Sequence, residues 1–240
     1  MNGSRPELVV IMPVYDEEDV VVSVVSDWIS VLTGLNIAFQ IRLYNDGSKD
    51  RTSDRTREAF GADLRVVLIE KENSGHGPTI LRGYRESGDA EWVFQADSDD
   101  EMPASPFKEM WRRRTVADFL IGNRLSRTAP SSRKVVTWMS RLIVWLLFGS
   151  RIRDVNSPYR LMRNSVFKEL FRSMPEDTFA PNLIVSGFVS KNRLRVEEIE
   201  VPFRCRRTGS GSIRKLKLFK ALKETIAYRV SGRMPVSGAN

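Results

Sequence analysis

The chain has 240 residues, and its 38 lysines and arginines against 30 aspartates and glutamates give a formal net charge of +8 and a pI near 9.8. A hydrophobic fraction of 41% is enough for a packed core and excludes a chain that is disordered over most of its length. The single cysteine, Cys205, and the single histidine, His76, exclude an intramolecular disulfide, a multi-cysteine zinc site and a metal site with two histidines.

We expect neither a signal peptide nor a membrane span in this sequence. The first ten residues lack the basic flank and long apolar stretch of a secretory signal, which favours reduced, cytoplasmic surroundings. The longest apolar run covers residues 142–148, whereas a span needs about 20 residues. The protein is therefore expected not to be integral to the membrane, although it can lie on the inner membrane surface.

The first half of the sequence alternates short runs of β-branched residues with segments of helical periodicity. Repeated strand–helix–strand units of this kind predict an α/β fold with a mostly parallel sheet and helices on both faces. Ligands of such sheets bind at the carboxyl ends of the strands. The pattern predicts strands at 7–12, 39–44, 64–69 and 92–96, and helices at 17–32, 51–60 and 78–86.

The second half is less regular. The apolar helix predicted at 135–148 is either part of the core or an interfacial helix that dips into lipid. We expect one catalytic domain over residues 1–205, followed by a basic loop and an amphipathic helix over 206–240. The other predicted elements are a strand at 117–121, a loop at 125–133, helices at 105–115, 165–171 and 180–191, a strand at 194–201 and a basic helix at 213–229.

The excess positive charge lies in one segment near the C-terminus. Between Phe203 and Lys223 there are eight basic residues and no acidic one, and the rest of the chain is balanced. A solvated helix face would explain such a run, but the apolar side of the helix, which includes Ile226, favours contact with an anionic membrane surface. No nucleic-acid-binding module accompanies the charge, so we do not expect a nucleic-acid partner.

Four carboxylates occupy the five positions 97–101, directly after the strand predicted at 92–96. Because like charges repel, such a cluster at a strand end favours a hard divalent cation such as Mg²⁺ or Mn²⁺, with oxygen ligands from protein and substrate phosphates. The alternative is an acidic cluster that opens the helix at 105–115. Two further polar motifs, at 12–18 and 45–50, follow the first and second predicted strands and add weight to a ligand site.

This series of motifs resembles the inverting glycosyltransferases of family 2, which have the GT-A nucleotide-diphosphosugar transferase fold. PVYDEE is similar to the P-x-Y-N-E-E of that family, NDGSKD to D-D-G-S-x-D, NSGHGPTILRG to N-x-G-x-G-x-A-x-x-x-G, and DSDDEMP to D-x-D-x-Q-x-P. GNR at 122–124, DVNSPYR at 154–160 and RTGSGS at 207–212 resemble the dolichol-phosphate mannosyltransferase and polyprenyl-phosphate glycosyltransferase branch. The chain departs from the family pattern at Asp16, Asn45, Pro78 and Glu101.

The resemblance implies a role for each motif. It places the donor in a pocket made by Pro13, Tyr15, Glu17, Asp46, Gly75 and Asp97, and a metal at Asp97, Asp99 and Glu101. It implies that Arg124, Arg133 and Arg207 hold phosphates, with Ser157, Arg160 and Ser212 at the acceptor. Asp154 is the candidate for orienting the acceptor or sugar or for work as a base, and its alternative is a cap or turn residue.

The expected function is therefore inverting, metal-dependent transfer of a sugar from a nucleotide-diphosphosugar to a dolichyl- or undecaprenyl-type phosphate at the cytoplasmic membrane face. A phosphate acceptor is largely ionised at pH 7, so it needs less help from a general base than a sugar hydroxyl does. Two alternatives stay open: a family 2 enzyme that acts on a saccharide hydroxyl, and a catalytically silent membrane-surface binding protein.

Overall fold

The structure, a computed structural model, describes residues 5–125, 142, 145, 149, 152–204, 215–232, 234 and 235. For residues 215–220, 222 and 229 only the backbone is described. Four residues singled out in the sequence, and most of the apolar helix expected at 135–148, lie outside the described residues. These four are Arg133, Cys205, Arg207 and Ser212.

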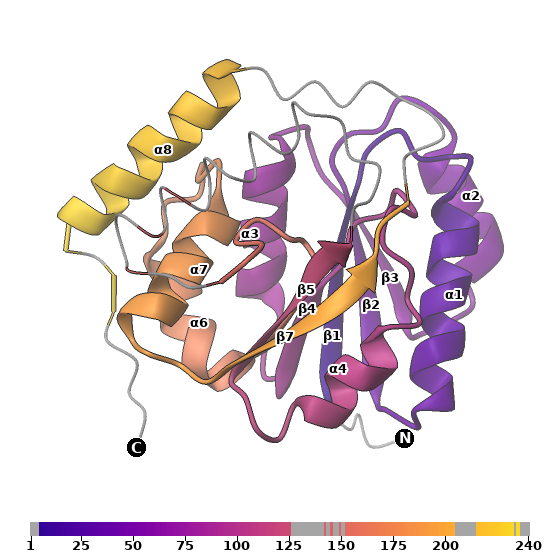
Figure 1. The fold of residues 1–240 in the computed structure, drawn as a ribbon. Helices are drawn as coiled ribbons and strands as arrows, with labels where there is room; N and C mark the ends of the chain where they lie inside the picture. Colours follow the sequence, from indigo (N-terminus) through magenta and orange to yellow (C-terminus); the bar gives the residue numbers. More distant parts are fainter. Residues whose placement is uncertain are drawn as a thin grey trace.

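The described strands form one seven-stranded sheet in the order β3-β2-β1-β4-β6-β5-β7 (Figure 1). The expected mostly parallel sheet is confirmed, and β6 alone among these strands runs against its two neighbours. The pattern of residues 160–163 did not predict this reversed strand. The strands are β1 (Leu8–Val14), β2 (Phe39–Asn45), β3 (Val66–Glu70), β4 (Trp92–Gln95), β5 (Phe119–Leu125), β6 (Arg160–Arg163) and β7 (Val196–Pro202).

Helices cover both faces of the sheet, as Figure 1 shows. One face is covered by α1 (Val21–Gly34), α2 (Thr52–Phe60) and α4 (Phe107–Arg113), and the other by α3 (His76–Glu86), α6 (Asn164–Ser173) and α7 (Pro181–Lys191). α8 (Lys215–Val230) packs on the outer side of α7.

The central strand explains why the sheet needs both layers. All seven residues of β1 are buried, and their side chains alternate between two cores. Val10 and Met12 pack toward α1, while Val9 and Ile11 pack toward α3. A strand that is apolar on both sides is typical of a parallel sheet between two helical layers, and each fully buried aliphatic side chain stabilises the fold by about 1.5–3 kcal/mol.

The reversed strand determines which loops meet. The carboxyl ends of β1, β2, β4 and β5 lie at one edge of the sheet, where the strand arrows point upward in Figure 1. Because β6 is antiparallel to β4 and β5, its amino end reaches the same edge. The segment 152–159, which enters β6, therefore lies beside the loops that leave the other strands.

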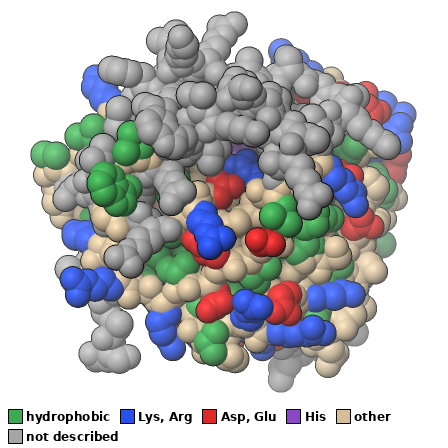
Figure 2. Space-filling model, in the orientation of Figure 1, with side chains coloured by type: hydrophobic (Ala, Val, Ile, Leu, Met, Phe, Trp, Pro, Cys, Tyr) green, Lys and Arg blue, Asp and Glu red, His purple; other side chains and the backbone are tan. Residues whose placement is uncertain are grey.

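The described side chains of α8 show which of its residues pack on the domain. Ala221, Thr225 and Tyr228 are buried, whereas Ile226 is 39% exposed and Val230 is 79% exposed. Hydrophobic side chains are visible at the surface on the α8 side of the molecule in Figure 2. Within the described residues, no helix combines the length and hydrophobicity that crossing a membrane requires.

Candidate active site

The loops that follow β1 and β2 are joined by backbone-to-carboxylate hydrogen bonds. The N–H of Lys49 donates to Asp16 at 2.7 Å, and the N–H of Glu18 donates to Asp50 at 3.0 Å. Asp16 has a φ of +51°, a conformation that Asn and Asp tolerate better than most residues. Two acidic residues of the sequence motifs thus serve to hold one loop against the other.

Asp46 lies at the end of β2, where both oxygens of its carboxylate accept hydrogen bonds from the protein. Its oxygens accept hydrogen bonds from the ammonium of Lys71, from the N–H of Ser74 at 2.8 Å and from the N–H of Gly75 at 2.9 Å. Burial alone would raise the pKa of Asp46, but Lys71 and Ser74 outweigh it, and the pKa lies below its ordinary value of 3.8. The carboxylate therefore adds stability above about pH 4, which is lost as the pH falls further.

Asn45, one of the departures from the family pattern, has a structural explanation. Its amide nitrogen donates to Glu70 at 2.7 Å and to Ser53 at 2.5 Å, while its oxygen accepts from Ser48. A carboxylate at position 45 would replace that donor with a negative charge facing Glu70. Asn45 and Glu70 therefore form a matched pair, and Asp46 is the acidic residue that directly follows β2.

The acidic turn after β4 is tied to the end of β1. The hydroxyl of Ser98 donates to the carbonyl of Pro13 at 2.9 Å, and Oδ1 of Asp99 accepts from the N–H of Glu101 at 3.1 Å. Oδ1 of Asp97 is buried and has no hydrogen-bond partner among the described residues, and it lies 3.9 Å from Nε2 of His76. A buried carboxylate oxygen without a donor is costly unless a ligand completes it.

These residues fit a divalent cation that shares its coordination with a ligand. Asp97, Asp99 and Glu101 offer only oxygen donors, which suit Mg²⁺ and Mn²⁺. No group of three or more His, Cys, Asp or Glu side chains within the described residues is arranged to hold a metal ion by itself. The unpartnered oxygen of Asp97 matches the usual arrangement for Mg²⁺, in which one or two carboxylates are supplemented by phosphate oxygens and water.

A bidentate ion pair faces this turn from the other half of the chain. Nε and Nη2 of Arg124 donate to the two carboxylate oxygens of Asp154 at 2.6 and 2.9 Å. Burial would lower the pKa of Arg124, but Asp154, together with Asp97 and Glu101, raises it above its ordinary value. The guanidinium therefore stays charged and both oxygens of Asp154 are engaged.

Arg160 and Ser157 lie beneath this pair and are fully buried. The guanidinium of Arg160 donates to the carbonyls of Val155, Ser157 and Asn182 at 2.5 to 3.2 Å, and burial lowers its pKa. The hydroxyl of Ser157 accepts from the N–H of Tyr159 at 3.3 Å. Both residues were predicted to touch an acceptor. In the structure Arg160 holds the turn that carries Asp154 against α7, and the Ser157 hydroxyl bonds within that turn.

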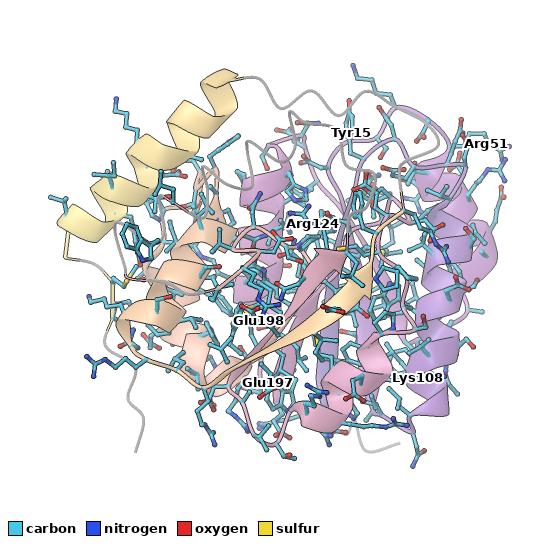
Figure 3. The ribbon with its side chains drawn as sticks, viewed as in Figure 1. Tyr15, Arg51, Lys108, Arg124, Glu197 and Glu198 are labelled. Carbon is cyan, nitrogen blue, oxygen red and sulfur yellow. The ribbon has the colours of Figure 1, made fainter. Side chains whose placement is uncertain are left out.

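The remaining predicted residues lie at the end of β1, in the loop after it and directly before α3. Pro13 and Glu17 are buried, whereas Tyr15 is 42% exposed and lies at the same end of the sheet as Arg124 (Figure 3). Asp16 raises the pKa of Tyr15. Gly75 has a φ of +92° just before α3, a backbone conformation that favours glycine.

Sequence reasoning missed a buried polar layer under the site. The hydroxyl of Tyr84 bonds to Gln95 at 2.5 Å and to Asn182 at 3.0 Å, which links α3, β4 and α7. Lys71 was also missed, although its ammonium binds Asp46 and its side chain is only 8% exposed. A lysine between two glutamates in the sequence looks like a solvated residue. Only its position directly after β3, at the sheet edge where the motifs meet, could have indicated a role in the site.

The comparison with protein families now identifies the class of this protein. The sequence model of "Glycosyl transferase family 2" matches residues 9–171, and the chain belongs to that family. Its fold is of the GT-A type. Glucosyl-3-phosphoglycerate synthase from Mycobacterium tuberculosis, solved with Mn²⁺, uridine diphosphate and phosphoglyceric acid, superposes with a TM-score of 0.67 over 98% of this chain and 80% of that chain, at 15% sequence identity.

Two curated relatives from different organisms share one name. Undecaprenyl-phosphate 4-deoxy-4-formamido-L-arabinose transferase of Pseudomonas paraeruginosa is 28% identical over 186 residues, which cover 75% of this chain and 53% of that protein. The enzyme of the same name from Edwardsiella ictaluri is 24% identical over 222 residues, which cover 90% of this chain and 66% of that protein. The chain thus spans about half to two thirds of the length of these relatives.

The matched pair at Asn45 and Glu70 can be tested by a double-mutant cycle. Asn45→Asp should lower the free energy of unfolding by about 1–2 kcal/mol, because it removes a donor and places two carboxylates in contact. Glu70→Gln in the same chain should recover most of the loss, since it restores a donor between the two positions. Urea unfolding of both single variants and the double variant measures the coupling, and additive effects would contradict the pairing.

Proposed function

We propose that the chain transfers a sugar, with inversion, from a nucleotide-diphosphosugar to a polyprenyl phosphate. The observation that carries this proposal is the meeting of two unlike half-sites at one sheet edge. One half-site is acidic and holds Asp46, Asp97 and Asp99; the other presents the cation Arg124, paired with Asp154. The names of the relatives support an undecaprenyl-phosphate acceptor.

The donor would lie over the first half-site. Pro13, Tyr15, Glu17 and Asp46 would line the nucleoside pocket. Gly75 would bring the backbone before α3 close to the diphosphate. We call Asp46, Gly75 and Asp97 together the donor site. The N–H groups of Ser74 and Gly75 tie the backbone before α3 to Asp46.

A divalent cation, Mg²⁺ or Mn²⁺, would be held by Asp97, Asp99 and Glu101, where it would stabilise the negative charge of the leaving nucleotide. The chain itself prepares this site, because the hydroxyl of Ser98 fixes the turn to β1 and the N–H of Glu101 orients Asp99. A nucleotide bound at Asp97 would also supply a partner for the buried oxygen of Asp97, which has none among the described residues.

The second half-site favours a phosphate over a hydroxyl acceptor. A sugar hydroxyl needs a base that can take its proton, whereas both oxygens of Asp154 are engaged by Arg124. An ionised phosphate needs no such base, and a bidentate guanidinium suits its oxygens. Arg124 would therefore hold the acceptor phosphate, and Asp154 would orient Arg124. We assign Arg133, Arg207 and Ser212 to the same phosphate, and Ser157 and Arg160 to support of the turn.

A lipid acceptor requires the chain to reach a bilayer. We propose that residues 206–240 form the membrane-facing part, with 1–205 as the catalytic domain, and that the protein binds the cytoplasmic face peripherally. The support is the outward side of α8, where Lys223, Ile226 and Val230 are exposed. Apolar residues next to cations are typical of helices that lie on anionic lipid.

The catalytic prediction uses two aspartates of one turn. Asp97→Asn should lower the rate of sugar transfer by about a hundredfold or more, because it removes charge at the buried, unpartnered oxygen. Asp100→Asn is the matched control: Asp100 is partly exposed, pairs with Arg204 at 3.3 Å and has a φ of +56° that Asn tolerates. It should keep nearly full activity.

The measurement is transfer from UDP-, GDP- and dTDP-sugars to undecaprenyl phosphate with Mn²⁺, after a thermal-shift screen has found the donors that stabilise the protein. Full activity of the wild-type protein in excess chelator would contradict the metal site. Transfer to saccharides but not to undecaprenyl phosphate would favour the hydroxyl-acceptor alternative. Binding of vesicles without any transfer would favour a silent membrane protein.

The membrane prediction concerns four lysines of α8: Lys215, Lys217, Lys220 and Lys223. Replacing them by Gln should weaken binding to anionic vesicles by up to about 4 kcal/mol, at roughly 1 kcal/mol per cation that reaches the surface. Added salt should weaken the binding of the wild-type protein, since screening acts over about 10 Å at 0.1 M.

Cosedimentation with anionic and neutral vesicles at two salt concentrations measures both effects. A charge-matched control replaces four exposed basic residues far from α8, namely Arg5, Arg55, Lys108 and Arg112, and should bind as the wild-type protein does. Equal loss in both quadruple variants would mean that net charge, and not α8, determines binding.

A further inference from the structure

Glu224 is the only acidic residue in the sequence of α8, which otherwise carries five basic residues. It points into the molecule. Its carboxylate accepts hydrogen bonds from the N–H of Phe179 at 2.8 and 2.9 Å and from the N–H of Ala180 at 3.1 Å. These two groups lie directly before α7, which has no capping side chain of its own. A carboxylate at this position satisfies backbone donors and complements the helix dipole.

The segment that Glu224 holds lies against the beginning of α3. A Cβ added to Gly77 would lie 2.1 Å from the carbonyl oxygen of Phe179 and 2.6 Å from that of Thr178. Backbone therefore touches backbone at this point, with no side chain to absorb a shift. His76, the residue before Gly77, is 3.9 Å from Asp97 across the donor site.

We propose that Glu224 is a positioning residue of the donor site: its carboxylate holds residues 178–180 against the first turn of α3, so that the seating of α8 sets the position of His76 beside Asp97. The contacts run in one series, from Glu224 to Phe179, from Phe179 to Gly77 and from His76 to Asp97. The membrane-facing helix and the donor site are thereby coupled. The link to a bilayer rests on the proposed function, whereas the link from Glu224 to His76 does not.

The single histidine makes this link measurable without any substrate. His76 is the one histidine of the chain. In protein labelled at histidine, the NMR signal of the imidazole ring therefore belongs to His76 and reports the donor site. At fixed pH, Glu224→Ala should displace the His76 ring signal, and Glu224→Gln, whose amide oxygen still accepts hydrogen bonds, should restore it in part. If Glu224→Ala does not fold, Glu224→Asp, which keeps the charge and retracts it by one methylene, should produce a smaller displacement in the same direction.

The matched control removes a second polar attachment of α8, between described residues. The hydroxyl of Tyr228 lies 2.5 Å from that of Ser173, so this contact joins α8 to α6 and not to residues 178–180. Tyr228→Phe should leave the His76 signal unchanged. An unchanged signal in Glu224→Ala, or an equal displacement in Tyr228→Phe, would overturn the proposal, because either result would show that the cap of α7 does not determine the position of His76.

A binding measurement extends the test to the donor. With Mn²⁺ and the best-binding of UDP, GDP and dTDP, the affinity of Glu224→Ala should fall by about fivefold, the size that loss of an ordinary helix cap allows. Tyr228→Phe should bind as the wild-type protein does, and equal losses would overturn the coupling. If the wild-type protein binds none of the nucleotides, the proposed donor site is wrong, while the His76 signal still decides the role of Glu224.

Discussion

Repulsion between carboxylates at one sheet edge is the constraint on which this structure depends. Asp16, Asp46, Asp50 and the turn at 97–101 all lie at the ends of neighbouring strands, where their charges oppose one another. The chain offsets this cost locally: backbone N–H groups donate to Asp16, Asp46 and Asp50, and a buried lysine neutralises Asp46. Among the described residues Asp97 keeps one buried oxygen without such a donor, and a bound ligand would satisfy it.

Much of the fold follows from local patterns. Leu8–Val14 is apolar at every position, and such a run between turn residues identifies a strand buried on both sides. The sequence of β6 gives no comparable signal, because Arg160 and Arg163 bound only two apolar residues. It becomes a strand since β4 and β5 offer backbone partners on both sides, and since Arg160 finds three buried carbonyls. Those partners are far apart in sequence.

The site was predictable as a set of loops but not as a set of contacts. The acidic motifs indicated which strand ends form a ligand site, because four mutually repelling carboxylates in five residues favour a bound cation. The partner of each carboxylate depends on tertiary contacts. Asp46 is bound by Lys71 and Asp154 by Arg124, whereas Asp97 has one unpartnered oxygen among the described residues. Glu224 shows the same limit, because in sequence it resembles any solvated helix residue, and only the beginning of α7 gives it a partner.

The reversed strand has an evolutionary consequence. Since β6 brings the segment 152–159 to the sheet edge from the opposite direction, the two half-sites come from separate stretches of chain, one before residue 102 and one after residue 121. Mutations in the exposed loops of the later stretch can change the second half-site while the packing of β1, β2 and β3 stays intact. Such a layout lets one scaffold diversify by changing one half-site at a time, as long as the close contact of residues 178–180 with Gly77 is kept.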